Sequence, residues 1–191
     1  MFEAADISIK LPPMKSGKSQ KWAGMLLLCL ALTGCATNEM IMQTPAMEPT
    51  LPQGSRFAVD DAAFSGKGPE RFSLVIFEYQ SNTFNEPVQA PAVGTQICYR
   101  VIGLPGEKVE ITESGVLING ELLRGPARVQ YEPAPASERY TRFNTLQLSE
   151  DGYFLLGDNS RRAWDSRYWG EVKRDQILGR VVPRTPAGTP N

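Results

Sequence analysis

Apolar and polar positions in this chain alternate over short stretches, and no long helical period follows the first 35 residues. Runs rich in β-branched and aromatic residues, separated by Gly- and Pro-containing segments, predict strands within residues 55–60, 71–79, 96–104, 151–160 and 176–184. Asn119 and Gly120 suit the positive-φ positions of a type I′ turn, so residues 115–123 predict a hairpin. The pattern indicates a mostly-β fold with little helix beyond the N-terminal segment.

Length, composition and charge agree with a single β-rich domain. A chain of 191 residues has room for one domain, and 17 Gly with 15 Pro are many for a helical protein. The 20 Lys and Arg nearly balance the 21 Asp and Glu. This balance argues against nucleic acid or an acidic ligand as a partner.

The N-terminus has the pattern of a bacterial lipoprotein signal. Three lysines precede an apolar run and the sequence LTGC: Lys15, Lys18 and Lys21, then residues 22–32 and 32–35. In such signals the Cys thiol is diacylated and the chain is cut before it, so Cys35 is the predicted lipidated N-terminus. The alternative is an uncleaved membrane anchor in which Cys35 is only a small apolar residue. The chain starts at Met1 or, if residues 1–13 are not translated, at Met14.

These features divide the chain into four predicted parts. Residues 1–34 are the N-terminal extension and signal peptide, 35–43 a lipidated tether, 44–184 the β domain and 185–191 a flexible tail. After the signal and Cys35, only Cys98 is left in the domain. No internal disulfide is therefore expected, and the core has to supply the stability.

The chain contains no histidine, which limits its chemistry. A Ser-His-Asp or Cys-His site is excluded, and neither a metal nor another cofactor is expected. A general base at neutral pH would be a carboxylate or a lysine with a lowered pKa. The lysines after Cys35 are Lys67, Lys108 and Lys173, and each stands in a sequence typical of the solvated surface.

Four collinear segments carry a resemblance to a known family. AMEPTL, RFSLVIFEY, YRVIGLPGEKV and GDNSRRAWDSRYWG resemble the successive motifs of bacterial type I signal peptidases, over residues 43–183. The resemblance implies a coiled β-sheet domain that is membrane-associated and faces the extracytoplasmic side of the cell envelope. It also implies a serine endopeptidase that removes signal peptides from exported proteins with a Ser nucleophile and a Lys general base.

The match to this family fails at the positions that perform the reaction. Ala46 stands where the family has its nucleophilic serine, and Tyr99 where it has the general-base lysine. Ala163 replaces the serine that orients that lysine. A methyl group cannot attack a carbonyl, and a tyrosine with a pKa near about 10 is a poor base at neutral pH. No intact catalytic residue is therefore predicted, which makes enzymatic activity uncertain.

Other positions of the family site are retained. By resemblance, Thr44 Oγ and the Ala46 N–H correspond to oxyanion-hole donors, and Met47 follows them in the peptide-binding loop; alternatively, Thr44 is an ordinary loop residue. From spacing alone, Asp158 and Asn159 suit a turn, and Asp165 and Arg167 suit an ion pair. The retained scaffold positions are Pro49, Arg100, Gly103, Asp158, Asn159, Asp165 and Arg167.

Three hypotheses follow for the function. The first is a catalytically inactive lipoprotein that binds an extended peptide or an exported protein segment at the membrane. The second is an active serine endopeptidase with relocated chemistry, using a hydroxyl with one of the three lysines; the candidate hydroxyls are Thr44, Ser55, Ser160 and Ser166. The third is a structural envelope lipoprotein in which Tyr99 closes the groove above Ala46.

Overall fold

The runs of β-branched and aromatic residues form strands wherever the sequence predicts them. A computed structural model describes residues 38–80, 90–125, 131–133 and 143–184, and all of them belong to one compact unit, residues 36–191. Helical segments in these ranges are short: η1 (Pro45–Met47), α1 (Ser166–Trp169) and η2 (Arg174–Gln176). None of the described helices has the length and apolarity needed to cross a bilayer. The prediction of a mostly-β fold is confirmed.

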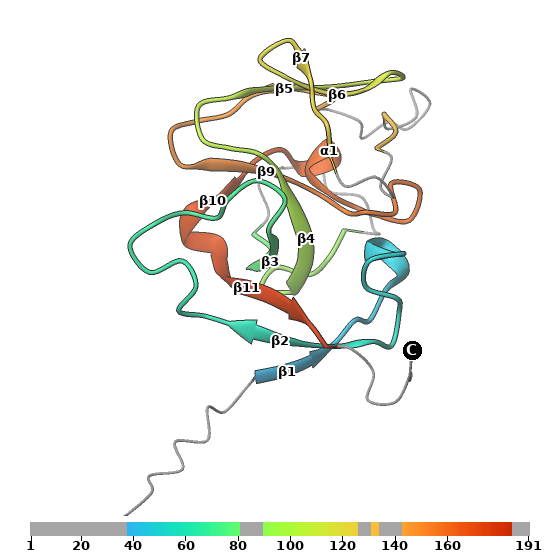
Figure 1. Ribbon diagram of the computed structural model, residues 1–191, viewed down its shortest axis with the longest axis vertical. Helices are drawn as coiled ribbons and strands as arrows, with labels where there is room; N and C mark the ends of the chain where they lie inside the picture. The colour runs from blue at the N-terminus through green and yellow to red at the C-terminus, as the bar shows by residue number, and fades with distance from the viewer. Residues whose placement is uncertain (1–37, 81–89, 126–130, 134–142, 185–191) are drawn as a thin grey trace, which may run out of the picture. The chain divides into compact units, whose positions relative to one another are not determined.

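The larger sheet has seven antiparallel strands, and its order differs from chain order. The order is β1 (Asn38–Ile41), β2 (Arg56–Asp60), β11 (Ile177–Pro183), β3 (Leu74–Glu78), β4 (Gln96–Gly103), β9 (Gly152–Leu156) and β10 (Val172–Lys173). The last long strand, β11, lies between β2 and β3 (Figure 1). The sheet therefore joins the two ends of the domain.

The smaller sheet has four strands and contains the predicted hairpin. Its order is β7 (Glu121–Leu122), β6 (Gly115–Ile118), β5 (Lys108–Thr112) and β8 (Thr145–Gln147). Between β6 and β7, Asn119 and Gly120 have φ angles of 52° and 86°. These values confirm the predicted type I′ turn, in which both central residues need positive φ.

The core consists of two hydrophobic clusters, and the second contains residues of β4 and β9 as well as of the smaller sheet. Gly103 lies at the end of β4, close to this second cluster. The strands β3 and β9 are buried almost throughout, as their unbroken apolar runs suggest. A Cβ on Gly103 would lie 2.5 Å from Val109 Cγ2 and 2.9 Å from Phe154 Cβ. The retained glycine therefore permits a close backbone approach that no other residue allows.

Strand β1 corrects the predicted boundary between the tether, residues 35–43, and the β domain. Residues Asn38–Ile41 pair antiparallel with β2, and Met42 is buried in the main cluster. The folded domain thus begins by Asn38 rather than at residue 44. The predicted signal peptide, Cys35, residues 185–191 and most of the loop at 132–143 lie outside the described residues.

Candidate functional site

The loop that carries Ala46 is a 3-10 turn, η1, with a defined start. Pro45 occupies its first position, where a missing N–H costs nothing, and the Thr44 Oγ1 accepts a long 3.4 Å hydrogen bond from the Ala46 N–H. The turn buries Met47 completely, whereas Pro49 after it is exposed. Thr44, Ala46 and Met47 therefore form one ordered loop, as the sequence predicts.

The turn after β9 fixes this loop in place. The Asn159 N–H donates to the Ala46 carbonyl at 3.0 Å, and the Asn159 amide donates to the Pro45 carbonyl at 3.1 Å. The Thr50 hydroxyl donates to the Asp158 carboxylate. Both residues of the predicted turn thus connect two parts of the chain that are more than 100 residues apart.

The three replaced positions meet at Gly157. A Cβ placed on Gly157 would lie 2.4 Å from the Ala163 Cβ, 2.7 Å from the Ala46 carbonyl oxygen and 3.0 Å from Tyr99 Cε1. These distances are too short for any side chain, so the contact requires glycine at this position. Ala46, Tyr99 and Ala163 therefore share one location.

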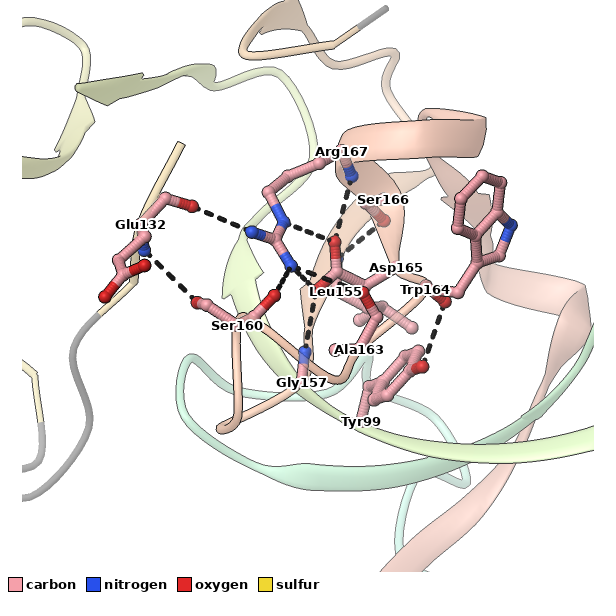
Figure 2. A network of polar contacts seen from close by, with 10 residues as sticks. All are labelled: Tyr99, Glu132, Leu155, Gly157, Ser160, Ala163, Trp164, Asp165, Ser166 and Arg167. Atoms are coloured by element: carbon pink, nitrogen blue, oxygen red, sulfur yellow. Dashed lines mark hydrogen bonds and ion pairs between the residues drawn. The ribbon is translucent and has the colours of Figure 1, made fainter. Parts of the chain in front are cut away.

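Tyr99 is built into the core. Only 4% of it is exposed, and its hydroxyl donates to the Trp164 carbonyl at 2.9 Å (Figure 2). Its ring lies 6.1 Å from those of both Trp169 and Phe77. Burial raises the pKa of Tyr99 well above its ordinary value, and the Asp165 carboxylate raises it further. The phenol is therefore a neutral hydrogen-bond donor and not a base.

The predicted ion pair of Asp165 and Arg167 is present and almost fully buried. The Arg167 Nε and Nη2 donate to the Asp165 carboxylate at 2.8 and 2.9 Å, while the Gly157 N–H donates to it at 3.1 Å (Figure 2). Arg167 also donates to the carbonyls of Ser160 and Glu132 at 2.7 and 2.8 Å. This network holds the segment between Gly157 and Ala163 against the loop of Ala46.

A second buried pair, between Arg100 and Asp158, was not predicted as a contact. The Arg100 Nε and Nη2 donate to the two carboxylate oxygens of Asp158 at 2.8 and 2.5 Å, and Arg100 Nη1 donates to the Phe72 carbonyl at 3.0 Å. The partners are 58 residues apart, so their spacing in the sequence does not predict the contact. The only sequence signals for it are their opposite charges and their places in two successive family motifs. It joins β4 to the turn after β9.

A cleft of about 690 Å³ borders the loop of Ala46. Strand β1 and the residues up to Thr44 contribute to its wall, as do Ala46 and Tyr99. Its other apolar walls come from Phe57, Ile76, Pro91, Ile97, Cys98 and Trp164. Tyr99 therefore contributes to the wall of the cleft but does not close it.

The three lysines considered for relocated chemistry all have acidic partners. Lys67 pairs with Glu70, and Lys108 with Glu110. Lys173 lies 2.7 Å from the Ser149 Oγ, a Ser–Lys contact that the sequence did not reveal because the two are 24 residues apart.

The Ser149–Lys173 contact does not have the properties of a catalytic dyad. Asp151 and Glu171 both pair with Lys173, and these hydrogen bonds raise its pKa. A lysine held protonated in this way cannot accept the serine proton. Among the described residues there is also no cluster of three His, Cys, Asp or Glu side chains for a metal.

Comparison with known proteins finds signal peptidases. The sequence model described as "Signal peptidase, peptidase S26" matches residues 19–185. A signal peptidase I of Leptolyngbya laminosa is 30% identical over 159 residues, which cover 83% of this chain and 73% of the relative. A signal peptidase I of Bacillus caldolyticus is 26% identical over 176 residues, covering 87% and 90%.

One solved structure is similar in sequence to part of the chain. The crystal structure of a signal peptidase I from Enterococcus faecalis V583 shows 32% sequence identity, covers 60% of this chain and 97% of its own, and has a TM-score of 0.42. The family match extends over most of the chain, including the motifs that meet at Gly157. The chain therefore belongs to the signal peptidase family, peptidase S26.

Proposed function

We propose that this chain is a non-hydrolysing member of its family that binds an extended peptide, or an extended segment of an exported protein, in the cleft beside Ala46. The observation that carries the proposal is the meeting of Ala46, Tyr99 and Ala163 at Gly157. All three side chains that the family chemistry needs are replaced at one place, while a cleft remains next to them.

The chemistry of the replaced side chains argues against cleavage. Covalent catalysis needs a nucleophile next to a base, and the methyl group of Ala46 and the buried phenol of Tyr99 supply neither. Losing a nucleophile and base that act as a unit costs on the order of 10⁶ in turnover. The acidic partners of Lys67, Lys108 and Lys173 also weigh against the second hypothesis, relocated catalysis with one of these lysines as the base.

The cleft has features suited to an extended peptide. Strand β1 is one of the two edge strands of the larger sheet, and Glu39, Met40 and Ile41 line the cleft. Edge strands offer unpaired backbone groups to which an extended peptide can add. The Thr44 hydroxyl is a further donor for a peptide carbonyl, and the Ala46 N–H can join it because its hydrogen bond to Thr44 Oγ1 is long, at 3.4 Å. The open space weighs against the third hypothesis, a purely structural lipoprotein with a closed groove.

The proposal includes anchoring through a lipidated Cys35 at the extracytoplasmic face of the membrane. Cys35 precedes Asn38, the first residue of β1, by three positions. Three extended residues span only about 10 Å. The cleft would therefore lie close to the lipid surface, where exported segments emerge.

Binding and cleavage can be measured on one sample. A labelled apolar signal peptide is titrated with the full chain by fluorescence anisotropy, and the same mixture is searched for fragments by mass spectrometry. Because the cleft is intact and the nucleophile is absent, we expect saturable binding without cleavage. Met40→Glu should weaken binding at least tenfold by placing a charge on the cleft wall, whereas Val182→Glu on β11, outside the lining, should not.

A restored variant provides the positive control. Ala46→Ser, Tyr99→Lys and Ala163→Ser together return the three family side chains to one location and should produce cleavage of the same peptide. Cleavage by the unmodified chain that Thr44→Ala abolishes would show an active enzyme and contradict the proposal. Absence of any saturable binding would contradict it as well.

A further inference from the structure

The cleft has one unbalanced charge. Its lining includes two charged side chains, Glu39 and Arg162. Glu39 has a partner, since Arg56 lies 3.5 Å from its carboxylate. The exposed Arg162 has no ion pair with any acidic residue that the structure describes. A positive charge at the cleft thus has no counter-charge from the protein's described part.

The neighbouring arginine shows the contrast. Arg161 pairs with Glu132 at 3.1 Å and is not part of the cleft lining. Of these two adjacent arginines, Arg161 is paired and lies outside the cleft lining. Arg162 lines the cleft and has no such partner among the described residues.

Arg162 is next in sequence to one of the residues that meet at Gly157. It directly precedes Ala163, whose Cβ packs at Gly157 beside the Ala46 carbonyl. The Arg162 N–H donates to the Asn159 carbonyl at 2.9 Å, which fixes the backbone of this loop. The Ala46 N–H and the Thr44 hydroxyl belong to the loop packed against the same turn.

We propose that the cleft recognises the free C-terminal carboxylate of an extended apolar peptide, with Arg162 as its counter-charge. This inference rests on the proposed peptide binding. A terminal carboxylate carries a full negative charge and two acceptor oxygens, which suit a guanidinium together with a backbone N–H and a hydroxyl. An internal peptide carbonyl is neutral and leaves the charge of Arg162 unused. The ligand class is thus a peptide that ends at the site rather than one that passes through it.

The experiment compares one apolar peptide in two forms, as the free C-terminal acid and as the C-terminal amide. Binding of each to the full chain is measured by anisotropy. The free acid should bind about tenfold more tightly, because charge-assisted contacts are the stronger ones. The preference should shrink at high salt, since Arg162 is exposed.

Matched variants assign the preference to one residue. Arg162→Gln should lower the affinity for the acid to that for the amide, and a urea denaturation midpoint equal to that of the unmodified chain shows that the variant folds. Arg161→Gln should keep the full preference.

The possible outcomes separate this inference from the proposed function. Equal affinity of the unmodified chain for acid and amide would overturn the carboxylate inference and leave peptide binding intact. A preference that survives Arg162→Gln would overturn the role of Arg162. If neither form binds, the proposed function itself fails.

Discussion

Tyr99 illustrates at the residue scale how a side chain beside the cleft forms part of the core. Its ring contacts Phe77 and Trp169, and its hydroxyl satisfies the Trp164 carbonyl. Introducing the lysine that the family resemblance implies at this position therefore removes both the packing and the hydrogen bond. We expect this substitution to lower the stability of the domain.

Two substitutions at this position separate packing from hydrogen bonding. Tyr99→Phe removes only the hydroxyl and should lower the free energy of unfolding by about 1 kcal/mol. Tyr99→Lys also removes the ring and buries an amine, so it should cost about 3 kcal/mol or more. Urea denaturation of both variants measures the difference. Equal midpoints for Tyr99→Lys and the unmodified chain would contradict the packing described for Tyr99.

Cys98 reports on the opening of the cleft. It lines the cleft but is only 3% exposed, and burial raises the pKa of its thiol to about 12. The neutral thiol contributes fully to stability below pH 9, the ordinary value, and this contribution is lost as the pH rises towards 12.

Alkylation at pH 8 tests this arrangement. The shift lowers the thiolate fraction of Cys98 by roughly 10³ relative to the unfolded chain, so native labelling should be correspondingly slow. Peptide mapping after iodoacetamide treatment, with and without urea, gives the two rates for Cys98 itself. Rapid native labelling would show that the cleft wall opens readily.

At the element scale, the turn between β9 and α1 depends on the buried pair of Asp165 and Arg167. Arg167→Met should leave the fully buried Asp165 carboxylate without its counter-charge and lower the free energy of unfolding by about 3–5 kcal/mol. Arg161→Met, in an exposed pair with Glu132, should leave it nearly unchanged. Chemical denaturation of both variants provides the comparison, and similar midpoints would argue against a stabilising role for the buried network.

The elements also show what sequence reasoning can and cannot reach. Strands β3 and β9 and the Asn119–Gly120 hairpin were predicted because their signals are local: apolar runs and a turn that needs positive φ. Strand β1 was missed because four residues with little β-branching carry no such signal, and its pairing with β2 forms it. The resemblance to the family motifs pointed to Ala46, Tyr99 and Ala163. The contacts of Arg100 with Asp158 and of Ser149 with Lys173 depend on the fold and could not be read from spacing.

At the scale of the whole molecule, one domain combines a family frame with an altered centre. The family match covers residues 19–185, and the buried pairs and the close approach at Gly157 hold that frame together. Ala46, Tyr99 and Ala163 lie where the segments of this frame converge. The loss of catalysis that we propose would therefore leave the connections between β4, β9 and the loop of Ala46 in place.

The position of β1, only three residues after Cys35, has a mechanical consequence. Strand β1 is joined to the rest of the sheet only along β2, and it also forms part of the cleft wall. In a chain held by a lipid on Cys35, any pull between membrane and domain acts first on these four residues. Tension at the anchor would therefore reach the ligand cleft directly, and a peptide that adds to β1 would strengthen the element that bears the load.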